Sequence, residues 1–322
     1  MTEFDLINQF FKRSPPRRAE LGIGDDGALL PAGKQTRVVA CDTMVCGRHF
    51  FEGAEPRALG YKALAVNLSD LAAMGAKPDA FLLALTLPHA DADWLAAFSD
   101  GLFELADKYD CELVGGDTTR GPLTITITAL GGVDPGSALR RDTAEPGDDL
   151  WVSGELGSPA VAVRARQTGH WPEGLRPELT AARLDRPEPR VSLGISLRHF
   201  ARAAVDISDG LIADIGHIGA RSRVRLQVNT DAVPVAACLG PMAPAEALNA
   251  ALTGGDDYEL AFTAAPENRP AIERIGATLD LPLSCIGQVM SGEGVSVVDG
   301  GGRPVTFGAA GHDHFGASIK AS

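Results

Sequence analysis

The sequence predicts an α+β fold with two mixed α/β domains, residues 1–139 and 140–322. The chain of 322 residues is long enough for two domains, and a hydrophobic content of 45% supports a core in each. Strand and helix patterns occur in both halves without regular βαβ alternation, and we expect helices to cover one face of each sheet. A polar, turn-rich stretch at 133–149 places the boundary near residue 140.

In the first domain, an amphipathic pattern predicts a helix at 2–13, which the Arg- and Pro-rich stretch after it ends. A second helix begins at Pro56, a position that proline tolerates, and closes at Gly75. A third helix at 91–110 has Asp91 as its expected cap. Alternating or continuous apolar runs predict strands at 36–42, 81–88, 111–117 and 122–133.

The second domain begins with a strand at 149–154 and a helix from about Pro159. The proline- and charge-rich stretch at 169–190 is expected to be an exposed excursion. The remaining pattern predicts helices at 190–200, 209–220, 244–252 and 267–279, and strands at 203–207, 224–230, 258–264, 284–289 and 294–299.

Composition excludes several classes of function. A net charge of −13 argues against a nucleic-acid or anionic-membrane surface, and an aromatic content of 6% argues against base-stacking platforms. No run approaches the roughly 18 apolar residues that a membrane span needs. The five cysteines are odd in number and form no C-x-x-C pair, which predicts neither a zinc site nor a disulfide framework. We therefore expect a cytoplasmic protein.

Short acidic clusters, most of them beside glycine, are the most informative feature. Carboxylates that converge repel one another unless cations neutralise them, and glycine lets a large ligand approach the backbone. The simplest interpretation is a set of Mg²⁺ ions that hold a polyphosphate. The clusters contain Asp25 and Asp26, Asp42, Asp70, Asp117, Asp206 and Asp209, and Asp256 and Asp257.

Each cluster also has a plain structural interpretation. Asp70 lies in an otherwise apolar helix but could face solvent, Asp209 could be a helix N-cap, and the glycine-rich stretches could be simple turns. The segment 22–27 matches G-x-G-x-x-G, but no apolar strand precedes it and its two acids would repel a pyrophosphate. No Ser-His-Asp or Cys-His arrangement indicates a covalent nucleophile.

Taken in order, these motifs resemble the thiamine-monophosphate kinase family, which is related to aminoimidazole ribonucleotide synthetase and selenophosphate synthetase. The resemblance rests on seven segments that span nearly the whole chain: GIGDDGALL, CDTMVCGRHF, YKALAVNLSDLAAMGAKP, LVGGDTTRGPL, AVDISDGLIADIGHI, GGDDYELAF and GHDHF. It implies a homodimer whose N-terminal sheets pair into a barrel-like interface. It also implies an active-site cleft that the second domain completes.

The resemblance implies ATP-dependent phosphorylation of thiamine monophosphate by direct, Mg²⁺-assisted in-line transfer. No strong general base is required, because the attacking phosphate oxygen is already anionic. The implied Mg²⁺ ligands are Asp26, Cys41, Asp42, Asp70, Asp117, Asp206 and Asp209. The implied ATP contacts are Gly116, Asp117, Arg141 and Ser208, and the implied substrate contacts are His49, Asp256 and His312.

Three of these positions depart from the family pattern. Cys41 replaces a hydroxyl residue, and because a thiol is a poor Mg²⁺ ligand we expect only its backbone carbonyl to contribute. His312 stands where the family has an aromatic residue that stacks on thiamine, so the contact would be weaker. Asp256 replaces the common Glu and shortens its reach.

Two other functions remain open from the residues alone. One is a sister ATP-dependent synthetase acting on another small phosphorylated substrate, which would release phosphate. The other is a non-catalytic sensor of metal or nucleotide, although the chain has no D-x-D-x-D-G calcium loop.

Overall fold

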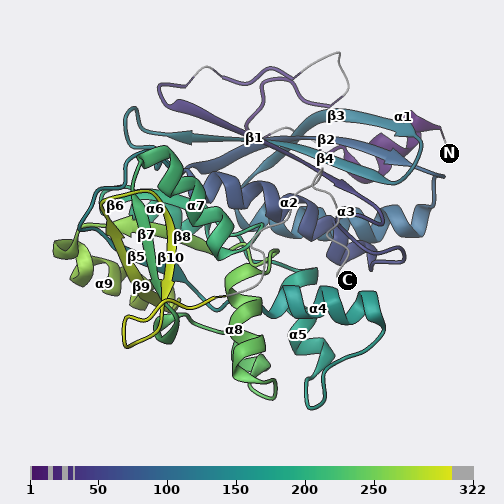
Figure 1. The fold of residues 1–322 in the computed structure, drawn as a ribbon. Coiled ribbons are helices and arrows are strands. Elements are labelled where there is room, and N and C mark those ends of the chain that lie inside the picture. The colour runs from purple at the N-terminus through teal and green to yellow at the C-terminus, as the bar shows by residue number, and fades with distance from the viewer. Residues whose placement is uncertain (1, 14–16, 24–27, 32, 307–322) are drawn as a thin grey trace. The chain divides into compact units, whose positions relative to one another are not determined.

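The computed structural model describes residues 2–13, 17–23, 28–31 and 33–306, which form two units (Figure 1). Unit 1 comprises residues 1–140, 185–201 and 274–279, and unit 2 comprises 141–184, 202–273 and 280–322. The predicted ranges 1–139 and 140–322 assign both short segments of unit 1 to the second domain. Asp26 and His312 lie outside the described residues.

The sheet of unit 1 has the strand order β1-β4-β2-β3, with β2 and β3 parallel and the other pairs antiparallel. Its helices α2 and α3 lie along one face of the sheet (Figure 1). The predicted N-terminal helix is split into a short α-helix and a π-helical turn. The elements are α1 (Glu3–Leu6), η1 (Ile7–Phe11), β1 (Thr36–Val45), α2 (Pro56–Ala73), β2 (Lys77–Leu87), α3 (Ala92–Lys108), β3 (Glu112–Arg120) and β4 (Thr124–Val133).

Helices α2 and α3 begin where the sequence predicts. Pro56 is the first residue of α2, and the Asp91 side chain caps α3 by accepting hydrogen bonds from two backbone N–H groups. The two helices cross at a pair of glycines. A Cβ on Gly60 would lie 2.0 Å from the carbonyl oxygen of Phe98, and one on Gly101 would lie 1.8 Å from that of Arg57. Only glycine permits this approach.

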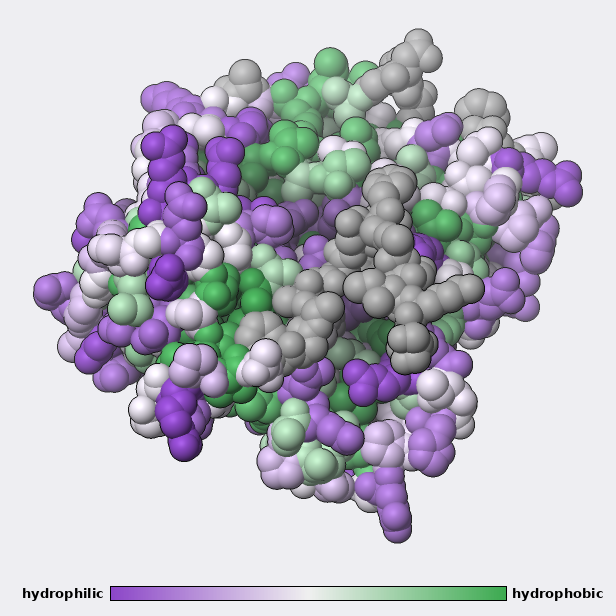
Figure 2. Space-filling view, viewed as in Figure 1, coloured by the Kyte–Doolittle hydropathy of each residue, from purple (hydrophilic) through white to green (hydrophobic). Residues whose placement is uncertain are grey.

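The two faces of the unit 1 sheet differ because strand side chains alternate. The face under the helices is buried and includes Leu83 and Ile127. The other face has no helix packed on it in the described part of the chain, and Val39 and Leu82 on it are 61% and 37% exposed. Figure 2 shows hydrophobic residues gathered at the surface over β1 and the segment before it.

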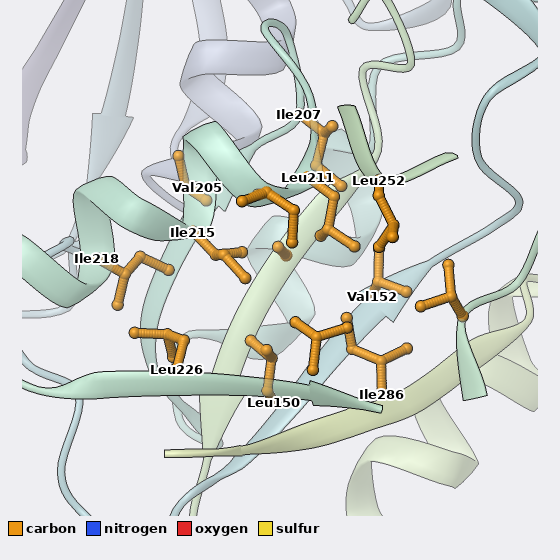
Figure 3. Packing of buried hydrophobic residues seen from close by; sticks show 14 of the residues in the cluster. Leu150, Val152, Val205, Ile207, Leu211, Ile215, Ile218, Leu226, Leu252 and Ile286 are labelled. Carbon is orange, nitrogen blue, oxygen red and sulfur yellow. The ribbon is translucent and has the colours of Figure 1, made fainter. Parts of the chain in front are cut away.

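Unit 2 contains a six-stranded sheet with the order β10-β7-β9-β5-β8-β6, in which β10 and β7 are parallel. Helix α7 packs on the sheet through Leu211, Ile215 and Ile218, which meet Leu226 and Ile286 in the main core (Figure 3). The predicted elements are confirmed. They are β5 (Asp149–Ser153), α4 (Ser158–Thr168), β6 (Ala201–Asp206), α7 (Leu211–Ser222), β7 (Arg225–Asn229), α8 (Pro244–Thr253), β8 (Leu260–Ala264), α9 (Arg269–Leu279), β9 (Leu283–Met290) and β10 (Gly294–Val298).

The expectation of a purely exposed excursion at 169–190 is wrong. Part of this stretch forms α5 (Pro177–Asp185), which buries Thr180, Ala181 and Leu184. Ala181 and Leu184 pack against Ala162 of α4, so the proline-rich stretch carries a small core of its own. Helix α6 (Val191–Leu197) follows it in unit 1.

In the part of the chain that the structure describes, no helix combines the length and the hydropathy that a membrane crossing requires.

Candidate active site

One of the predicted metal ligands of unit 1, Asp42, is hydrogen-bonded to Asn67 of α2. The backbone N–H of Asp42 on β1 donates to Oδ1 of Asn67 at 3.0 Å, and the amide of Asn67 in turn donates to the carbonyl of Ala63 at 3.1 Å. Asn67 is 1% exposed. Asp70 lies three residues further along α2, on the same side of the helix, and is half-buried. The structure therefore brings the carboxylate-bearing positions 42 and 70 to one end of the helix–sheet contact.

His49 lies in a tight turn that follows β1. The ring Nδ1 of His49 accepts a hydrogen bond from the backbone N–H of Val45 at 3.0 Å. The backbone N–H of His49 donates to the Val45 carbonyl at 2.9 Å. The neutral ring therefore carries its proton on Nε2. Because the turn uses Nδ1, a ligand contact of His49 must use Nε2.

The Gly-Gly-Asp motif lies inside β3 and not at its end, where the predicted strand 111–117 places it, because the strand continues to Arg120. A β-bulge at Val114 shifts its register against β2. Gly116 has φ of 147°, and a Cβ there would lie 1.8 Å from the Leu83 carbonyl oxygen. Asp117 is exposed on this edge strand. The motif thus presents its acid from a strand edge and not from a loop.

Asp117 does not meet Asp42 within unit 1. Both lie at about the same level of the sheet, but β4 and β2 separate their strands, which corresponds to roughly 14 Å across three strand spacings. Their side chains also lie on opposite faces. Asp117 pairs with Ala84 of the uncovered face, whereas Asp42 pairs with Ile127 of the face under the helices.

Cys41 presents its side chain to the uncovered face, where the hydroxyl of Thr128 donates to its sulfur at 3.3 Å. The side chain of Asp42, the next residue, points to the other face. The thiol of Cys41 therefore cannot share an ion with the Asp42 carboxylate.

In unit 2, the turn after β6 and the turn before β8 are hydrogen-bonded to each other. The N–H groups of Asp256 and Tyr258 donate to the carbonyls of Ser208 and Ile207, both at 2.8 Å, and the Ile207 N–H donates to the Glu259 carbonyl at 2.9 Å. The fold thus places Ser208, an expected ATP contact, beside Asp256, an expected contact of the acceptor substrate.

The first of these turns wraps around the carboxylate of Asp214. One oxygen, Oδ2, accepts hydrogen bonds from the backbone N–H groups of Ser208, Asp209 and Gly210 at 3.0–3.1 Å. Burial, followed by the charge of Asp206, raises the pKa of Asp214 to about 7. Asp209 does not cap α7, since the N-cap is Gly210 and no side chain caps it. The alternative of a simple capping role for Asp209 is wrong.

The turn before β8 is held by two buried acids, Asp257 and Glu259. Both carboxylate oxygens of Asp257 accept from the Gly157 N–H, at 2.9 and 3.2 Å, and burial raises the pKa of Asp257 well above its usual value. Asp256 and Tyr258 have φ values of 68° and 50°. Such backbone costs about 1–3 kcal/mol per residue. Asp256 itself is half-buried, so the acids on either side of Tyr258 hold a strained turn that presents Asp256.

Sequence reasoning missed the supporting acids Asp214 and Glu259. Asp214 had a readable signal, because it is an acid in an apolar helical pattern, four residues after the Asp-Gly turn. Glu259 had none, because an acid at the start of a strand usually faces solvent. Arg141 is exposed at the start of unit 2, where its carbonyl accepts from the Ser222 hydroxyl at 2.8 Å.

Comparisons with known proteins assign the chain to a family. Residues 24–133 match the AIR synthase related protein, N-terminal domain, family. The chain is 46% identical over 319 residues to the thiamine-monophosphate kinase of Salmonella typhimurium, which covers 97% of this chain and 98% of that relative. The solved thiamine-monophosphate kinase of Stenotrophomonas maltophilia K279a has a TM-score of 0.83 at 50% identity, covering 89% of this chain and 92% of that one. AaThiL complexed with AMPPCP and TMP has a TM-score of 0.77 at 31% identity, covering 91% and 92%.

Unit 1 therefore contains the N-terminal domain of an AIR synthase related protein. Within that class, the chain belongs to the thiamine-monophosphate kinase family and is an enzyme. The resemblance read from the sequence is confirmed, as is the mixed α/β architecture with two sheets.

Proposed function

We propose that the protein transfers the γ-phosphoryl group of ATP to the phosphate of thiamine monophosphate, giving thiamine diphosphate and ADP. The observation that carries this proposal is the full-length similarity to thiamine-monophosphate kinases, among them AaThiL complexed with AMPPCP and TMP. The site geometry supports it, because the turns with Ser208 and Asp256 are hydrogen-bonded neighbours.

The acids of both units fit Mg²⁺ by their chemistry, since all of them offer hard carboxylate oxygens. Among the described residues, no three His, Cys, Asp or Glu side chains lie close enough together to hold an ion by themselves. Mg²⁺ in kinases commonly uses one or two carboxylates and takes its other ligands from phosphates and water, so this spread-out set suits ions that arrive with ATP. When bound, Mg²⁺ neutralises the charge that develops on the transferred group. The residues that would hold it are Asp26, Asp42, Asp70, Asp117, Asp206 and Asp209, with the Cys41 carbonyl.

The protein's own groups then act by positioning. Ser208, together with Gly116 and Arg141, is assigned to ATP, and the Nε2–H of His49 is suited to donate to the acceptor phosphate. The carboxylate of Asp256 would be repelled by a phosphate, so we assign it to the cationic thiamine moiety. No side chain has to remove a proton, because the attacking oxygen is anionic near neutral pH.

We further propose that the protein acts as a homodimer in the cytoplasm, and that two copies pair through the uncovered sheet face of unit 1. The support is the exposed apolar side chains of that face, Val39 and Leu82. A barrel-like interface would follow if the two sheets close on each other.

The separation of Asp42 from Asp117 suggests how such a dimer would work. An ion held by two carboxylates needs them within a few ångström of each other, since Mg²⁺–oxygen bonds are about 2.1 Å long. Within one copy the two acids lie roughly 14 Å apart on opposite faces of the sheet. We therefore propose that edge strand β1 of one copy lies beside edge strand β3 of the other where the two sheets join, so that one ATP site combines Asp42 of one copy with Asp117 of its partner.

The reaction is tested by incubating purified protein with ATP, Mg²⁺ and thiamine monophosphate, and measuring ADP and thiamine diphosphate together. Equal amounts of both products, abolished by EDTA, are expected. Release of free phosphate without thiamine diphosphate would instead indicate a sister synthetase, and nucleotide binding without turnover would indicate a sensor.

A further inference from the structure

The carboxylate of Glu259 is buried and is held by groups from two other elements. Glu259 is 1% exposed. One oxygen forms an ion pair with Arg183 of α5, and the other accepts from the hydroxyl of Ser153 on β5 at 2.5 Å. A Cβ on Gly154 would lie 2.1 Å from the first oxygen, so this glycine leaves the space that the carboxylate fills. A buried carboxylate of this kind requires its cationic partner.

Arg183 comes from the proline-rich stretch, and its place is fixed by packing. Its neighbour Leu184 is 3% exposed and packs with Ala181 against Ala162 of α4. The side chain of Arg183 is about one-third exposed, whereas that of Glu259 is 1% exposed. Helix α5 thus delivers one cation to one buried acid.

The ion pair lies at the base of the strained turn. The Glu259 carbonyl accepts from Ile207, and three residues earlier the Asp256 N–H donates to Ser208 at 2.8 Å. Between these points, Asp256 and Tyr258 both have positive φ. A turn with such backbone persists only when its surroundings determine it, and Glu259 is its anchor on the strand side.

We propose that Arg183 is a positioning residue for the acceptor substrate. By pairing with Glu259 it fixes the 255–259 turn, and through the turn it sets the place of Asp256. This role rests on the proposed function, in which Asp256 contacts thiamine monophosphate. It also gives the proline-rich stretch a purpose, which is to carry α5 to this turn.

The test compares Arg183→Met with Arg176→Met, a matched loss of charge at an exposed residue just before α5. Arg183→Met is expected to raise the KM for thiamine monophosphate about tenfold, with the KM for ATP within about twofold of the wild-type value. Arg183→Lys, which keeps a cation, is expected to stay within about threefold on both. If Arg183 had a merely structural role, its loss would lower the fraction of active protein and therefore the apparent kcat. The two KM values would then not change differently. Equal changes in both KM values, or none, would overturn the proposal.

Two further measurements keep the outcomes distinct. If Arg183→Met folds poorly because Glu259 is left unpaired, the double variant Arg183→Met with Glu259→Gln removes the buried charge and should still show the split in KM. Hydrogen exchange of residues 254–260 should be faster in Arg183→Met than in Arg176→Met. This measurement does not depend on which reaction the enzyme catalyses. Wild-type protein that makes no thiamine diphosphate overturns the proposed function and the substrate role with it. Equal exchange in the two variants overturns the anchoring itself.

Discussion

The two units hold their acidic residues by different means. In unit 1, Asp42 and Asp117 lie on strands and Asp70 on a helix, so regular backbone hydrogen bonding fixes their positions. In unit 2, Asp206 ends strand β6, but Asp209 and Asp256 lie in turns outside the strands and helices. The comparison shows that an acid on a regular element needs little local help, whereas an acid in a turn needs additional buried groups to hold it.

Those additional groups are themselves acids. Asp214 accepts three backbone N–H groups, and Asp257 accepts the N–H of Gly157. Burial raises the pKa of both, to about 7 for Asp214, which is the electrostatic cost of holding the turns from inside. The turns with Asp209 and Asp256 in unit 2 therefore depend on a second set of acids, whereas the described Asp42, Asp70 and Asp117 of unit 1 lie on regular elements.

The largest effect is expected from a strand-held acid. Asp117→Asn should lower turnover by about 100-fold or more, because in the proposed site it removes a charge that would face the metal-bound phosphates. Its free energy of unfolding should change by less than about 0.5 kcal/mol, since Asp117 is exposed. Asp100→Asn, also at an exposed position of unit 1, is the control. Steady-state kinetics and urea unfolding test the pair, and near-normal turnover of Asp117→Asn would remove this residue from the site.

The next prediction concerns the separation of Asp42 from Asp117. Asp42→Asn and Asp117→Asn proteins should each be nearly inactive alone. After they are unfolded, mixed in equal amounts and refolded, about a quarter of wild-type activity should return, because half of the dimers carry one intact site of two. Recovery is measured by thiamine diphosphate formation, with each variant refolded alone as control. If mixing restores nothing although mixed dimers form, both acids act within one copy.

A third prediction compares the supports of the two units. Asp214→Ala leaves three N–H groups without their acceptor, one of them buried and two part-buried, and should lower the free energy of unfolding by roughly 3 kcal/mol. Asn67→Ala leaves only the Asp42 N–H without its acceptor and should cost about 1–3 kcal/mol. Urea unfolding at neutral pH measures both. The three hydrogen bonds indicate that the turn in unit 2 depends strongly on Asp214. Equal losses of stability in the two variants would contradict this.

These contrasts also explain what the sequence could and could not predict. The strands and helices were predicted from the spacing of apolar residues, and two helix starts were predicted from Pro56 and Asp91. All of these are local signals. Several acids that bear the expected chemistry, such as Asp117 and Asp256, were marked by neighbouring glycines, but Asp42 and Asp70 were not. The supporting roles were harder to predict: Asp214 had a local signal, but Asp257 and Glu259 differ from surface acids only in being buried, and burial arises from contacts between distant segments such as α5 and β8. For the same reason the sequence ended strand β3 at Asp117, although pairing with β2 continues it to Arg120.

The smallest effect is expected at Glu188, a half-buried acid of unit 1. The pKa of Asp214 is raised, whereas the pKa of Glu188 is lowered. Burial alone would raise its pKa, but hydrogen bonds from Lys108, Tyr109 and Tyr61, at 2.6, 2.6 and 3.0 Å, hold it below the ordinary 4.5. A pKa lowered on folding adds stability that is complete above the unfolded pKa and disappears as pH falls through the folded one. Glu188→Gln should therefore cost about 1 kcal/mol or less at pH 7, a value discounted for its exposure.

The stability difference between wild type and Glu188→Gln should vanish as the pH is lowered from about 6 to about 3. Glu188 then becomes a neutral carboxylic acid, which carries no charge, as the glutamine carries none. Urea unfolding across that range measures it, with Glu173→Gln, at an exposed position of unit 2, as control. A cost that does not depend on pH would mean that the two tyrosines hold Glu188 by shape and neutral hydrogen bonds alone. The contrast with Asp214, where backbone donors face an acid crowded by another acid, would then lose its electrostatic basis.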